Sequence, residues 1–111
     1  MQFKRSKSTL EYPPYSRFQP QAFGQSTWLE ITHIYNQIVR DPEQRARLSE
    51  LMIRSGMGSN PDALGTKMYH ADPLRTLRLY QRVNPRINLS NLVAEDPYEV
   101  MAGLVYIFSA D

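Results

Sequence analysis

Polar and apolar positions from residue 27 onward follow the period of α-helices, and one dipeptide separates the apolar runs. Asp or Asn stands directly before Pro five times. An Asp or Asn side chain can accept a hydrogen bond from a free N–H of the first helical turn. Proline is tolerated as the first helical residue, because the N–H that it lacks would have no partner within the helix. The sequence therefore predicts helix starts at five pairs: Asp41-Pro42, Asn60-Pro61, Asp72-Pro73, Asn84-Pro85 and Asp96-Pro97.

The first two helices are expected at Trp28 to about Arg40 and at Pro42 to about Ser55. Thr27, with Glu30 three residues later, resembles a capping box and predicts the first start. Gly56 is a suitable left-handed cap for the second helix. On each helix the apolar residues share one face. These residues are Trp28, Ile31, Tyr35, Ile38 and Val39 on the first helix, and Leu48, Leu51 and Met52 on the second.

Two shorter helices should follow the loop "SGMGSN". One carries Leu64 and Met68, and the next, "DPLRTLRLYQRV", places its apolar residues on one side. Residues 84–95 are ambiguous. Ile87 and Leu89 alternate as in a strand, whereas Leu89, Leu92 and Val93 suit a helix.

The last helix, from Pro97 to about Ser109, is apolar over most of its circumference and should be central and buried. "VYIF" would also suit a strand, but the capping pair of Asp96 and Glu99 favours a helix. Its apolar residues are Val100, Met101, Leu104, Val105, Ile107 and Phe108. The predicted fold class is all-α: a compact bundle of five to six short helices (residues 26–111) preceded by an extended N-terminal arm rich in proline and aromatics (residues 1–25).

The arm is the main candidate for binding a partner. Proline fixes φ and disfavours helix in the residue before it, so the segment should be extended. Three of its aromatic residues are spaced by three and would line one edge of a polyproline II helix. The alternative is an unstructured leader, although such segments are usually poor in aromatics. The candidate partner-binding residues are Tyr12, Pro13, Pro14, Tyr15, Phe18 and Phe23.

Composition limits the kinds of site and the cellular locations that we expect for this chain. The chain has 111 residues and no cysteine, which excludes disulfides and thiolate metal sites. No apolar run approaches the roughly 18 residues of a membrane span. A secretory signal has an apolar segment after its basic residues, and the basic N-terminus of this chain is not followed by one. We expect a cytoplasmic location, or incorporation into a virus particle or another large assembly.

Charge is unevenly distributed. Residues 67–90 carry five basic and one acidic residue, whereas residues 91–111 carry four acidic residues and no basic one. A basic patch is predicted on one face of the fourth helix and just after it, at Arg75, Arg78, Arg82 and Arg86. Such a patch can bind phosphates or the carboxylates of a protein partner. It can also be neutralised by the acidic final segment, within the chain or between subunits.

Signals for catalysis or metal binding are weak. Glu30 and His33 lie three apart on a helix but have no obvious third ligand. His70, next to a helix start, is expected to cap or contact backbone. "SGMGSN" lacks the Lys-Ser/Thr ending of a phosphate-binding loop. We therefore expect no catalytic residues, no metal and no cofactor.

The favoured hypothesis is a non-enzymatic structural or assembly subunit that docks onto other protein subunits, in a hetero- or homo-oligomeric assembly, through its arm. A multi-subunit particle such as a phage virion is one setting in which extended arms are used. The alternatives are a small nucleic-acid-binding module, which would use the arginine patch and the basic N-terminus, and a regulatory protein-interaction adaptor.

Overall fold

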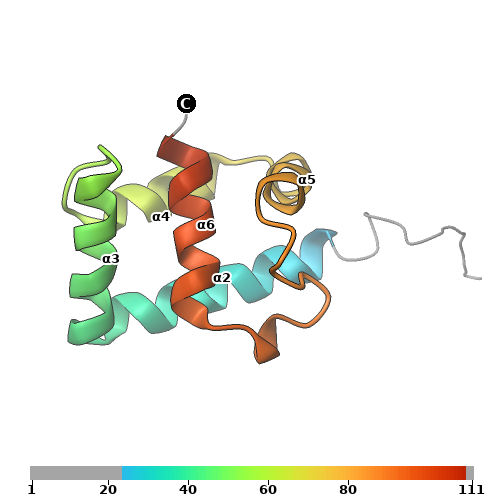
Figure 1. The fold of residues 1–111 in the computed structure, drawn as a ribbon, viewed down its shortest axis with the longest axis horizontal. Coiled ribbons are helices and arrows are strands. Elements are labelled where there is room, and N and C mark those ends of the chain that lie inside the picture. Colours follow the sequence, from blue (N-terminus) through green and yellow to red (C-terminus); the bar gives the residue numbers. More distant parts are fainter. Residues whose placement is uncertain (1–23, 110–111) are drawn as a thin grey trace, which may run out of the picture.

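The computed structural model describes residues 24–109, which form five α-helices, one 3₁₀ turn and no strand (Figure 1). The predicted all-helical class is confirmed for this part of the chain. The predicted arm lies almost entirely outside the described residues. The elements are α2 (Gly24–Arg40), α3 (Pro42–Arg54), α4 (Pro61–His70), α5 (Pro73–Val83), η2 (Leu92–Ala94) and α6 (Pro97–Ser109).

Helix α6 is the centre of the bundle. It contacts α2, α3, α4 and α5, and in Figure 1 it crosses the middle of the molecule between α3 on one side and α5 on the other. All six apolar residues expected on it are buried. The helix prediction is confirmed over the strand alternative, and its bounds agree with the expected ones.

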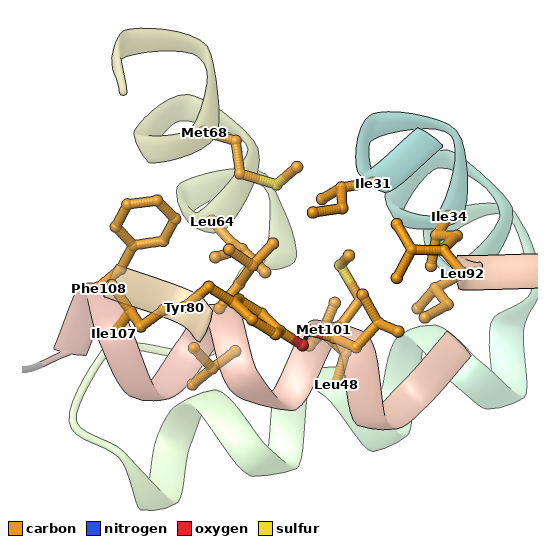
Figure 2. Packing of buried hydrophobic residues seen from close by; sticks show 14 of the residues in the cluster. Ile31, Ile34, Leu48, Leu64, Met68, Tyr80, Leu92, Met101, Ile107 and Phe108 are labelled. Carbon is orange, nitrogen blue, oxygen red and sulfur yellow. Dashed lines mark hydrogen bonds between the residues drawn. The ribbon is translucent and has the colours of Figure 1, made fainter. Parts of the chain in front are cut away.

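The core is built around α6 from side chains of every other helix (Figure 2). Ile31 of α2 and Leu64 of α4 are fully buried, as is Tyr80 of α5. Burying one large apolar side chain stabilises a fold by about 1.5–3 kcal/mol. The largest fully buried side chains are Tyr80, Ile31, Leu48, Met52, Leu64, Leu77, Met101, Leu104, Val100 and Val105.

Four of the five predicted Asp/Asn-Pro starts are confirmed. Asp41, Asn60, Asp72 and Asp96 each accept a hydrogen bond from a backbone N–H of the first helical turn, at distances from 2.9 to 3.5 Å. In each case proline is the first helical residue. These caps satisfy N–H groups that have no partner within the helix, and therefore fix where α3 to α6 begin.

The prediction of a helix start at Asn84-Pro85 is wrong. Asn84 ends α5, since its N–H donates to the Tyr80 carbonyl at 2.8 Å. The following residues form turns, in which the Asn88 side chain accepts a hydrogen bond from the Ser90 N–H at 3.0 Å. Such local side-chain bonds compete with helix formation. Residues 84–95 are therefore neither the strand nor the α-helix that the pattern allowed, and contain only the short η2.

The first helix begins three residues before Thr27, so the start predicted at Trp28 is wrong. Thr27 lies inside α2 and is only 6% exposed. No proline lies between Pro20 and Pro42. No proline therefore prevents the helix from beginning before Thr27. The left-handed cap expected at Gly56 is confirmed, with φ of 82°.

Candidate functional site

The six candidate arm residues, Tyr12, Pro13, Pro14, Tyr15, Phe18 and Phe23, lie outside the described residues. Their proposed role stays a prediction. The described part of the chain offers two surfaces that such a role, or its alternative, would use: the arginine patch of α5 and a groove beside α2.

The arginine patch lies on the surface, as predicted. Arg75, Arg78 and Arg82 are exposed along α5, opposite the buried Leu77 and Tyr80. Arg86 is exposed in the turn that follows α5. The helix turns its apolar side to α6, because a 3.6-residue period places residues 77 and 80 on one face. The arginines are therefore on the solvent side.

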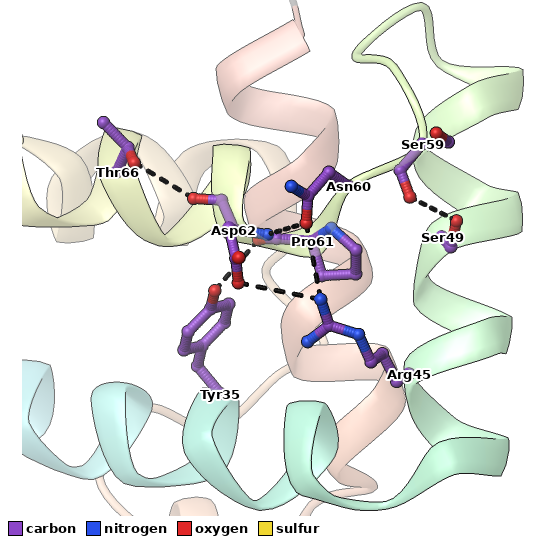
Figure 3. Close-up of polar contacts among 8 residues, drawn as sticks. All are labelled: Tyr35, Arg45, Ser49, Ser59, Asn60, Pro61, Asp62 and Thr66. Carbon is purple, nitrogen blue, oxygen red and sulfur yellow. Dashed lines mark hydrogen bonds and ion pairs between the residues drawn. The ribbon is translucent and has the colours of Figure 1, made fainter.

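Within residues 24–109, none of the four patch arginines forms a salt bridge with another described residue. Two of the three arginines of α3, Arg45 and Arg47, do contact described side chains (Figure 3). Arg45 lies 3.7 Å from the Asp62 carboxylate and donates to the Asn60 side chain at 3.4 Å. Arg47 lies 3.9 Å above the centre of the Tyr98 ring. Arg45 and Arg47 thus tie α3 to neighbouring elements, whereas no described acidic side chain pairs with the patch arginines.

The acidic final segment does not neutralise the patch inside the described domain. Glu95 accepts a hydrogen bond from the Asn88 N–H at 3.0 Å, and Asp96 caps α6. Glu99 is exposed on α6, and Asp111 lies outside the described residues. The expected intramolecular pairing is therefore not found between residues 24 and 109, and pairing between subunits stays a prediction.

A second surface, the aromatic groove, lies between α2, α4 and the start of α5. Its volume is about 280 Å³. Its walls include Trp28 and Tyr35 from α2, Gly65, Met68 and Tyr69 from α4, and Pro73 from α5. Tyr69 is 84% exposed, and Trp28 is half-buried. A groove lined by aromatic rings and a proline is suited to apolar and proline-rich ligands.

Tyr35, one of the residues that line this groove, is held in place by a hydrogen bond (Figure 3). Its hydroxyl donates to the Pro61 carbonyl at 2.9 Å, so the side chain joins α2 to the first turn of α4. A Cβ atom on Gly65 would collide with the Tyr35 hydroxyl, which shows how closely the two helices approach. Burial, followed by the negative charge of Asp62, raises the pKa of Tyr35, which keeps the hydroxyl protonated as a donor.

The sequence did not reveal this groove. Trp28 and Tyr35 were expected on the buried face of the first helix, and both do pack against the core. The Tyr35 hydroxyl occupies the space beside Gly65, and α4 ends at His70, two features that the apolar pattern of the first helix does not indicate. Tyr69 and Pro73 gave no signal of their own. An aromatic pair seven residues apart, facing a helix with a central glycine, is the pattern that would have indicated it.

The other candidates from the sequence are the two histidines. His33 is exposed on α2, and between residues 24 and 109 no three His, Asp or Glu side chains are grouped so that they could hold a metal ion. The ring of His70 packs edge-on against that of Tyr69, with 5.2 Å between ring centres. Of the helices that the structure describes, none has the length and apolar character needed to cross a membrane.

Comparison with known proteins adds no further clue. Neither protein-family models, nor curated proteins, nor solved structures include a match to this chain.

Proposed function

We propose that this chain is a non-catalytic assembly subunit that binds neighbouring protein subunits through the arm residues Tyr12 to Phe23. The supporting observation is that apolar residues are found both in the core of the helical domain and in the arm that precedes it. Residues 24–109 supply five helices with fully buried side chains on each of them from α2 to α6. The arm adds four more aromatics and three prolines within residues 11–24.

Arm aromatics are strong binding groups if a partner covers them. Burying one large apolar side chain contributes about 1.5–3 kcal/mol. Prolines reduce the entropy lost when an extended segment is ordered, because φ is already fixed. Twelve residues from Tyr12 to Phe23 span up to about 37 Å at the 3.1 Å rise of polyproline II. An extended arm can thus cover a large surface on a partner with few residues.

A multi-subunit particle, of which a phage virion is one example, is the setting that we propose. There the domain would occupy one position, and its arm would reach the next subunit. The partners are protein subunits, of the same or of a different kind, and no step of this role needs a cofactor or a catalytic residue.

Substitution within the full-length chain tests the proposal. Replacing Tyr12, Tyr15 and Phe18 with Ser removes the apolar edge of the arm without shortening it. We expect an unchanged helical circular dichroism spectrum and loss of incorporation into the native assembly, measured by light scattering of material from the native source. A matched control replaces Ser16, Gln19 and Gln21 with Ala and should assemble normally. Normal incorporation of the aromatic-to-Ser chain would refute the proposal.

Nucleic-acid binding is the second candidate, and it is favoured by the arginine patch, whose members form no salt bridge within residues 24–109. Phosphate contacts release counterions. The logarithm of the binding constant therefore falls linearly with the logarithm of the salt concentration, with a slope of about −0.9 per phosphate contact. If Arg78 and Arg82 contact phosphates, replacing both with Ala should reduce the slope by about two. The control replaces Arg40 and Arg54, which are exposed on other helices, and carries the same net charge. Absence of binding to DNA or RNA at low salt would eliminate this candidate.

A further inference from the structure

We propose that the aromatic groove is the acceptor site for the arm of a second copy of this chain. The inference rests on the function proposed above and names the partner. In this arrangement, part of the segment 12–23 of one copy lies between α2 and α4 of the next copy.

The chemistry of groove and arm is complementary. Proline-rich extended peptides bind grooves lined by aromatic rings, because the preformed helix loses little entropy and its prolines pack flat on the rings. The groove presents Trp28 and the 84%-exposed ring of Tyr69, and Met68 and Pro73 also line it. The arm presents Pro13 and Pro14 among aromatics spaced by three. Methionine adapts its shape to aromatic partners and makes favourable sulfur contacts with them.

The position of the groove favours a second copy over the chain's own arm. On α2 the groove extends from Trp28 to Asn36, along the helix and away from the point where the arm joins it. The arm joins at Gly24, the first residue of α2. To enter its own groove, an arm would have to reverse direction directly before Gly24. That turn would use Pro20 to Phe23, which are part of the binding segment. An arm from another copy needs no reversal.

An arm-in-groove contact of this kind is heterologous, since a different surface is used on each partner. Such contacts form rings or open chains unless two copies exchange arms reciprocally. Each copy then has one arm to give and one groove to offer, so association increases with concentration and can extend beyond a pair.

Complementation between two full-length variants tests the inference. The arm variant carries Tyr12→Ser, Tyr15→Ser and Phe18→Ser. The groove variant carries Asn36→Glu and Tyr69→Glu, at two exposed positions on the rim, so that its core is untouched. We expect wild type to associate and each variant to be monomeric by light scattering. A mixture of the two variants should form a 1:1 pair, because one retains a groove and the other an arm.

Trp28 supplies a direct signal, since it is the only tryptophan of the chain and lines the groove. A synthetic peptide of residues 8–23 contains no tryptophan. Added to the arm variant, it should change the Trp28 fluorescence in a saturable manner, and the groove variant should bind it at least tenfold more weakly. The control variant Tyr106→Glu alters another exposed tyrosine, on α6, and should bind the peptide normally.

Three results of these experiments would overturn the proposal that the groove binds the arm of a second copy. A mixture that stays monomeric while wild type associates overturns the inference, as does a groove variant that associates or binds the peptide like wild type. A wild-type chain that is monomeric at all concentrations also overturns it. Failure of the proposed function is a separate result. If the groove variant enters the native assembly and the arm variant does not, only the acceptor site is wrong. If the arm variant enters as well, the arm function itself is refuted.

Discussion

Tyr80 of α5 lies against Gly103 of α6 so closely that a Cβ atom on Gly103 would be 2.7 Å from the Tyr80 Cζ. The Tyr80 hydroxyl donates to the Val100 carbonyl of the same helix at 2.9 Å, and the side chain is fully buried. The absence of a side chain at residue 103 thus lets a buried tyrosine hold α5 to the central helix.

Gly103→Ala should destabilise the domain. In an exposed helix interior this substitution gains up to about 1 kcal/mol, but here the added methyl collides with the Tyr80 ring, and overpacking costs about 1–3 kcal/mol. We expect a net loss in the free energy of unfolding, measured by urea denaturation. In a Tyr80→Leu background the loss should shrink, whereas a Tyr69→Leu background should leave it unchanged. An equal loss in both backgrounds would show that the Tyr80 contact is not the cause.

Tyr80→Phe should cost about 1 kcal/mol at neutral pH, the usual net value of one hydrogen bond, and should also change the response to alkali. Burial raises the pKa of Tyr80 above the ordinary value of 10.0. Above pH 10 the unfolded chain therefore loses this proton while the folded chain keeps it. The contribution is complete below pH 10 and declines as pH rises toward the folded-state pKa.

Denaturation at pH 8 and pH 11 checks this dependence. The wild-type free energy of unfolding should fall between the two, and the fall should be smaller in Tyr80→Phe. Tyr69→Phe, at a ring that is 84% exposed, should show the wild-type fall. If Tyr80→Phe and wild type lose the same amount, Tyr80 does not carry the effect.

Asp96→Ala should remove the cap of the central helix. The Asp96 carboxylate accepts the Tyr98 N–H at 2.9 Å, and loss of such a cap costs about 0.5–2 kcal/mol. The comparison is Asn91→Ala, since Asn91 precedes η2 without a side-chain cap bond and should cost less. Thermal denaturation followed by circular dichroism gives both values. Equal midpoints for the two variants would contradict the capping role.

Asp96 and Asn84 show how far the sequence predicts this fold. Each stands before a proline, and the dipeptide alone does not separate them. Asp96 is followed by a long apolar segment that the core can bury, so a helix forms. After Asn84 come Asn88, Ser90 and Asn91, whose side chains favour turns. The apolar content that follows a cap therefore decides whether the cap starts a helix.

The surfaces were less predictable than the helices. Exposure of Arg75, Arg78 and Arg82 follows from helical spacing, and it was predicted. Their lack of an acidic partner within residues 24–109 was not, because net charge does not show that the Glu95 carboxylate is held by a backbone N–H. The groove required knowledge of how α2 packs on α4. Neither the contact of Tyr35 with Gly65 nor the exposure of Tyr69 follows from helical spacing.

Amide hydrogen exchange of the full-length chain, measured over a series of concentrations, tests most directly whether the arm finds its binding surface outside its own domain. We predict that amides of residues 8–23 exchange rapidly in dilute monomer and become protected as the chain associates, while those of α6 are protected throughout. Protection of residues 8–23 that is already complete in the dilute monomer would contradict the proposal, because the arm would then belong to the fold of a single copy.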